Sequence, residues 1–151
     1  LEVVLMVGIQ TKFRAIADDC CLACSYLYGA YHSMADECET NPLFIETAVC
    51  AAMLQELETL DAIDKNGFVK DAEKLLSDAT GKKWRVTKKR VESIQELPEH
   101  KYAVVNFEFN EHNHWVLFKD KKFLYNTLED SQCFKYGKPV DARVFSLIEG
   151  D

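Results

Sequence analysis

Two short segments, far apart in the sequence, carry the residue types of a thiol nucleophile and its base. Residues 18–25 read Asp-Asp-Cys-Cys-Leu-Ala-Cys-Ser, and residues 112–118 read His-Asn-His-Trp-Val-Leu-Phe. A thiol reacts as its thiolate, which the free amides at a helix N-terminus stabilise, and a nearby imidazole can take its proton. A cysteine at the start of a helix and a histidine leading a strand are therefore typical of a cysteine hydrolase.

The first segment offers two candidate nucleophiles. Asp18 or Asp19 can cap a helix that continues to about residue 35, which places Cys20 or Cys21 in the first turn. His114 is the candidate base, because it begins an apolar strand that would hold its ring rigidly. In this pattern a third polar group orients the imidazole and fixes its tautomer.

Asn126 and Asp130 are the candidates for that third group. If the hairpin after His114 has a loop with an odd number of residues, Val116 pairs with Asn126, which then shares a face with His114. If the loop has two residues, Val116 pairs with Tyr125 and Asn126 points away. Asp130 has the same parity as Asn126 but lies beyond the regular pairing. The sequence leaves the loop length open.

The rest of the chain predicts the elements that position these residues. With 151 residues and 48% hydrophobic content, residues 1–151 form one globular domain. Helical periodicity and caps predict helices over residues 19–35, 42–60 and 68–79. β-Branched and aromatic runs predict strands over residues 84–87, 102–109, 115–118, 123–126 and 142–148. This order predicts an α+β fold, with N-terminal helices packed on a C-terminal antiparallel sheet.

Charge and cysteine usage exclude several function classes. The net charge of −7 argues against nucleic acid as a partner, and no stretch approaches the ~20 apolar residues of a membrane span. The apolar residues 1–9 have no basic region and contain Glu2, so they do not read as a signal peptide. Cys20 and Cys21 are adjacent and Cys50 lies in an apolar run, which favours free thiols in a reducing, cytoplasmic compartment. The expected partner is a peptide or protein substrate, and no cofactor is implied.

These motifs resemble those of the papain-like cysteine peptidase superfamily. Residues 21–25, Cys-Leu-Ala-Cys-Ser, are similar to the Cys-Trp-Ala-Phe-Ser of papain-like proteases and to the Cys-Tyr-Phe-x-Ser of small uncharacterised bacterial and phage proteins of that superfamily. The later His-Trp-Val and Tyr-Asp-Pro-Leu of those small proteins resemble residues 114–116 and 125–128. The resemblance implies a papain-like fold and a peptidase that forms a thioester, with Cys21 as nucleophile, His114 as base and Asn126 as orienting residue.

A second resemblance shifts the register by one residue. The bacteriocin-processing peptidases carry Asp-Cys-Gly-x-Ala-Cys, which is similar to residues 19–24. This match implies Cys20 as the nucleophile and Asp130 as the third residue. We favour Cys21, because the residue before the nucleophile is small in these families and Cys20 can fill that position.

The chain departs from the family pattern at the oxyanion hole. Papain-like enzymes place a Gln a few residues before the cysteine, whereas Arg-Ala-Ile stands at residues 14–16 and the nearest upstream Gln is Gln10. Backbone amides or a loop carrying Gln10 could replace that group. The departure also supports an alternative function, a catalytically inactive papain-like module that binds peptides.

A zinc site is a further alternative. Cys21 and Cys24 with His112 and His114 have the residue types of four zinc ligands. Structural zinc sites usually place such a cysteine pair on a tight turn, whereas this pair continues into a predicted helix. The sequence therefore favours thiol chemistry over metal binding.

Overall fold

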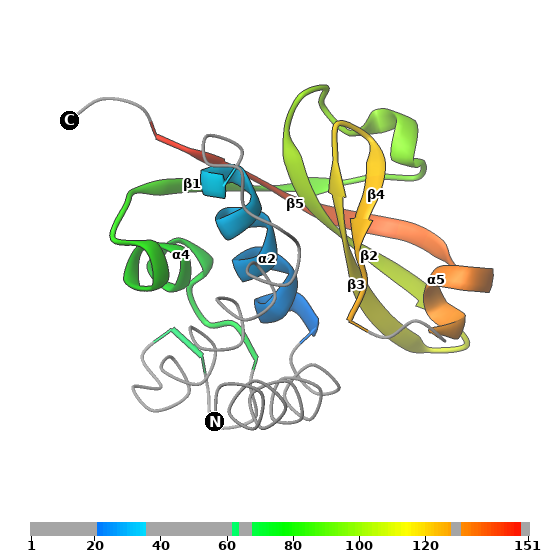
Figure 1. The fold of residues 1–151 in the computed structure, drawn as a ribbon. Coiled ribbons are helices and arrows are strands. Elements are labelled where there is room, and N and C mark those ends of the chain that lie inside the picture. Colours follow the sequence, from blue (N-terminus) through cyan, green and yellow to red (C-terminus); the bar gives the residue numbers. More distant parts are fainter. Residues whose placement is uncertain (1–20, 36–61, 64–67, 128–130, 149–151) are drawn as a thin grey trace, which may run out of the picture.

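The computed structural model describes residues 21–35, 62–63, 68–127 and 131–148. Over these residues the protein is α+β, as predicted, with helices packed on a five-stranded antiparallel sheet (Figure 1). The predicted helix over residues 42–60 and the candidates Gln10, Cys20 and Asp130 lie outside the described residues.

The sheet has the strand order β1-β5-β2-β3-β4, and each neighbouring pair is antiparallel. Its strands are β1 (Trp84–Arg90), β2 (Tyr102–Phe109), β3 (His112–Lys119), β4 (Lys122–Tyr125) and β5 (Lys138–Leu147). The bounds of β2 match the prediction, whereas β1 and β5 are longer than expected. They lengthen because β1 pairs with β5 over its whole length, and β5 also pairs with β2.

A tight turn between β2 and β3 makes β3 begin earlier than the predicted residue 115. Asn110 and Glu111 both have positive φ, 50° and 67°, as a two-residue hairpin turn of type I′ requires. His112 and Asn113 therefore belong to β3, which begins two residues before His114. The longer strand places His114 inside the sheet, where pairing with Phe107 fixes its backbone.

Helix α4 (Ala72–Thr80) begins later than the predicted residue 68. Val69 forms a β-bridge with Ile63, and Asp71 caps the helix by accepting a hydrogen bond from the Lys74 amide. Between β1 and β2 lies a short 3₁₀ helix, η1 (Ile94–Glu96). Its N-terminus is capped by a capping box that Ser93 and Glu96 form.

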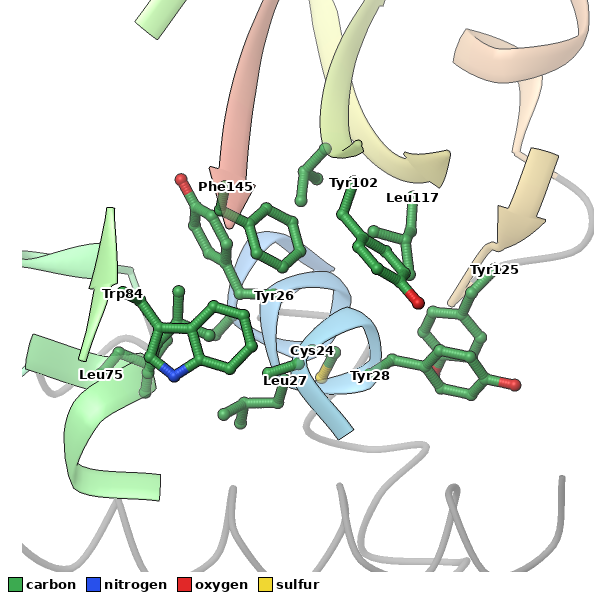
Figure 2. Packing of buried hydrophobic residues seen from close by; sticks show 14 of the residues in the cluster. Cys24, Tyr26, Leu27, Tyr28, Leu75, Trp84, Tyr102, Leu117, Tyr125 and Phe145 are labelled. Atoms are coloured by element: carbon green, nitrogen blue, oxygen red, sulfur yellow. The ribbon is translucent and has the colours of Figure 1, made fainter. Parts of the chain in front are cut away.

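Helix α2 (Cys21–Ala35) packs on one face of the sheet and forms the main core with it. Tyr26 and Tyr102 each lie beside the Phe145 ring, with ring centres 5.3 and 5.8 Å away (Figure 2). A Cβ atom on Gly29 would lie only 2.5 Å from Phe145 Cζ and 3.1 Å from a methyl group of Leu117. Gly29 is therefore where the helix backbone approaches the sheet most closely.

The opposite face of the sheet is covered by the short helix α5 (Gln132–Tyr136), which the sequence did not predict (Figure 1). Phe134 of α5 lies 5.0 Å from Phe107 and 6.2 Å from Phe118, measured between ring centres. Because side chains alternate along a strand, His114 shares this face with Phe118, whereas Trp115 faces α2.

Candidate active site

The hairpin between β3 and β4 decides where the third candidate residue lies. Its loop has two residues, Asp120 and Lys121, both with positive φ, and Phe118 pairs with Phe123 beyond it. The register then shifts, so that Leu117 pairs with Tyr125. This β-bulge adds one residue to β4 and reverses the parity of the residues that follow.

The predicted consequence of a two-residue loop was therefore wrong for this hairpin. Such a loop was expected to turn Asn126 away from His114, but the bulge returns Asn126 to the face on which His114 lies. His114 Nε2 and Asn126 Oδ1 are 2.6 Å apart, a hydrogen bond that spans twelve residues of sequence. The structure thus brings these two predicted site residues together.

This hydrogen bond sets the chemical state of the histidine. The amide Oδ1 can only accept, so in the neutral ring Nε2 carries the proton and Nδ1 is left as a base. The imidazole is 7% exposed. Burial lowers the pKa of His114, and the hydrogen bond to Asn126 opposes that effect in part. His114 therefore rests as a neutral, oriented imidazole.

Cys21 is the first residue of α2, where backbone amides have no partner within the helix. The backbone amides of Trp115, Leu22 and Cys21 itself each lower the pKa of this thiol. Burial outweighs them, so the pKa of Cys21 is raised overall, and nearby Cys133 raises it further. Trp115 directly follows His114, so the thiol meets β3 beside the candidate base.

The Trp115 amide was not anticipated as part of the site. The pairing of β4 with β3 ends at Leu117 and Tyr125, so β4 does not cover the edge of β3 beside Trp115. The N-terminus of α2 meets the sheet at this point. The bulge that ends β4 early is thus the local feature that both opens this edge and positions Asn126.

The two pKa directions indicate a neutral pair at rest. A raised thiol pKa and a lowered imidazole pKa both favour the uncharged forms over a thiolate–imidazolium ion pair. The amides around the sulfur can then stabilise negative charge as it develops during a reaction, which is how an oxyanion hole works.

The zinc alternative also named Cys24 and His112. Cys24 is fully buried in the core under α2, and His112 is exposed at the start of β3. In the part of the chain that the structure describes, no group of three or more His, Cys, Asp or Glu side chains could hold a metal ion. The four residues proposed as zinc ligands are therefore not gathered into one site.

Cys133 is the second sulfur near the site, and its position was not predicted. It lies on α5, is 8% exposed, and belongs to the apolar cluster that also contains Phe107 and Val116. Its sequence neighbourhood, between a Ser131 cap and Gly137, marks only a short helix. Nothing in the spacing could have indicated that this helix folds back toward Cys21.

Comparisons with protein-family models, with curated proteins and with solved structures gave no match for this chain. The described residues include no helix of the length and hydrophobicity needed to cross a membrane. The function proposed below is therefore argued from the geometry around Cys21, His114 and Asn126.

Proposed function

We propose that this protein is a papain-like cysteine hydrolase that cleaves an amide bond of a peptide or protein through a thioester at Cys21. The observation that carries the proposal is the hydrogen bond between His114 and Asn126, combined with a thiol that contacts the amide of Trp115. A nucleophile at a helix start, a base on a strand and a polar residue that orients the base together form the set that thiol catalysis requires.

The reaction begins with proton transfer from the Cys21 thiol to Nδ1 of His114. The sulfur attacks the substrate carbonyl carbon, and the resulting oxyanion accepts hydrogen bonds from amides at the start of α2. The tetrahedral intermediate then collapses to a thioester, while the imidazolium protonates the leaving amine. Water, deprotonated by His114, attacks the thioester and releases the acid and the free thiol. Asn126 holds the ring in place throughout.

A catalytically inactive papain-like module that binds peptides is the second candidate. The raised pKa of Cys21 and the lowered pKa of His114 favour this reading, because both hold the pair uncharged. The same residues would then contact a bound peptide without a reactive thiolate. The two candidates differ in whether the sulfur takes up an acyl group.

Intact-mass spectrometry with p-nitrophenyl acetate as acyl donor tests the proposal. We expect one acetyl group on the protein, mapped to Cys21, and its loss in Cys21→Ser. Cys24→Ser serves as the matched control, since Cys24 lies on the same helix but is fully buried. We expect His114→Gln to slow acetylation by about 100-fold, the lower range for a general base. Acetylation of other cysteines at the same rate would support the inactive module instead.

A further inference from the structure

A pocket of about 230 Å³ lies beside α2, between the start of α4 and strands β1 and β5. It is lined by Tyr26, Lys70, Asp71, Ala72, Glu73, Val86, Lys88 and Arg143. We call it the Tyr26 pocket. It is separate from the pair of Cys21 and His114, neither of which lines it.

The donors in this pocket are largely unused. Tyr26 is 1% exposed, and among the described residues no hydrogen bond involves its hydroxyl, which lies beside β5 in Figure 2. Burial raises the pKa of this phenol despite the opposing charge of Arg143, so the hydroxyl keeps its proton and can donate. Within the described residues, neither Lys70 nor Lys88 forms an ion pair.

The acceptors, in contrast, are engaged. Asp71 accepts a hydrogen bond from the Lys74 amide at 3.1 Å, and Glu73 accepts one from the Val86 amide at 2.9 Å. Arg143 donates through one nitrogen to Asp141 at 2.9 Å, which leaves its other N–H groups available. Backbone amides thus hold one oxygen of each carboxylate, whereas the side chains of Tyr26, Lys70 and Lys88 have no hydrogen-bond or ion-pair partner among the described residues, which favours a ligand that brings acceptor oxygens.

The charges agree with this reading. Three cationic side chains and two carboxylates line the pocket, so its lining has one excess positive charge. The free amides in the first turn of α4 add a partial positive charge at the same place. Tyr26 points to the ligand independently of the helix end, because its side chain is 1% exposed, lines the pocket and has no hydrogen-bond partner among the described residues.

We propose that the Tyr26 pocket binds a small oxyanion, a carboxylate or a phosphate group, with Tyr26 and Arg143 as the inner donors and Lys70 and Lys88 at the rim. Arg143 also lies 5.0 Å from the centre of the Trp115 ring, so the pocket adjoins the strand that carries the candidate base. The binding site does not depend on the proposed thiol chemistry and can be tested in a Cys21→Ser background.

The test is an NMR titration of the protein with sodium phosphate and, separately, with sodium acetate, each against sodium chloride at equal ionic strength. We expect saturable shifts of the amides of residues 70–73 and 86–88 with at least one of the two oxyanions, and none with chloride. The arm that saturates at the lower concentration identifies the group. Shifts scattered over the surface, or equal shifts with chloride, would overturn the proposal.

Two variants identify the donors. Tyr26→Phe removes only a hydroxyl without a partner, and we expect it to weaken binding about tenfold, as for a hydrogen bond to a charged group. Tyr136→Phe, at an exposed tyrosine on α5, is the matched control. Lys70→Gln with Lys88→Gln should also weaken binding, whereas Lys83→Gln with Lys101→Gln should not. Full affinity in both pocket variants would contradict the assignment.

Discussion

Helix α2 packs on one face of the sheet and α5 on the other, and the two faces bury different kinds of side chain. The α2 face holds a continuous aromatic core around Phe145 and Trp84. The α5 face holds a smaller cluster of phenylalanines, together with His114 and Cys133. The candidate site draws its thiol from the helix on one face and its imidazole from the other. The amide of Trp115, the residue after His114 in β3, lowers the pKa of that thiol, so β3 connects the two parts of the site.

Removal of a fully buried aromatic ring should have the largest effect on stability. We expect Phe145→Ala to lower the free energy of unfolding by about 3–5 kcal/mol, because the ring is fully buried and contacts Tyr26, Trp84 and Tyr102. Phe123→Ala, whose ring is 54% exposed beside the α5 cluster, should cost much less. Urea unfolding of both variants measures the difference. Equal losses would contradict the central place of Phe145 in the core on the α2 face.

A substitution where α2 lies close to the sheet should give a smaller loss of stability on the same face. Gly29→Ala places a methyl group against Phe145 and Leu117, so we expect a loss of about 1–3 kcal/mol despite the higher helix propensity of alanine. Ser33→Ala, at a half-buried position of the same helix, is the control and should stay within about 0.5 kcal/mol. Thermal unfolding followed by circular dichroism measures both. A stabilised Gly29→Ala variant would mean that the helix can move away from the sheet.

At the edge of β3, loss of the orienting amide should affect reactivity more than stability. We expect Asn126→Ala to slow alkylation of Cys21 by iodoacetamide about tenfold, because the imidazole loses the partner that fixes its tautomer. Its stability should fall by only about 1–3 kcal/mol, the cost of one unsatisfied buried donor. Thr127→Ala, at the next residue, is the control for the alkylation rate. An unchanged rate in Asn126→Ala would remove Asn126 from the site.

The pH dependence of the free energy of unfolding should show the protonation state of His114. Burial lowers its pKa in the folded protein below the ordinary value of about 6.5, so the unfolded chain binds more protons. The free energy of unfolding should therefore fall as the pH drops below about 6.5 and level off below the folded pKa, with no contribution from this residue at higher pH.

Urea unfolding between pH 5 and pH 8 measures this slope. His114→Gln should flatten it. A slope that survives in His114→Gln would assign it to another group. Stability that rises as the pH falls would mean that His114 is charged in the folded protein.

The sequence could predict what depends on local pattern. The run of β-branched and aromatic residues from Tyr102 to Phe109 specifies β2 without reference to the rest of the chain. Likewise, capping residues predict a cysteine near a helix start, and the strand pattern predicts a histidine on a strand. The short helix α5 was missed because five residues are too few for a helical period to be visible.

The site itself depends on an irregularity that alternation cannot reveal. Two-residue and odd-numbered loops were weighed for the hairpin, but the structure combines a two-residue turn with a bulge before Tyr125. A bulge shifts every later side chain to the other face, so the position of Asn126 could not be decided from parity alone. The contact of Cys21 with the amide of Trp115 required the three-dimensional placement of α2 at the sheet edge.

The most direct test of the central claim is the alkylation rate of each cysteine, measured by peptide mapping after brief exposure to iodoacetamide at pH 7. Because burial holds the Cys21 thiol neutral, its reactivity should depend on proton removal by His114. We expect Cys21 to react faster than Cys24 and Cys133, and His114→Gln to slow Cys21 alone by at least about tenfold. A rate for Cys21 that does not change in His114→Gln would contradict the proposed pair.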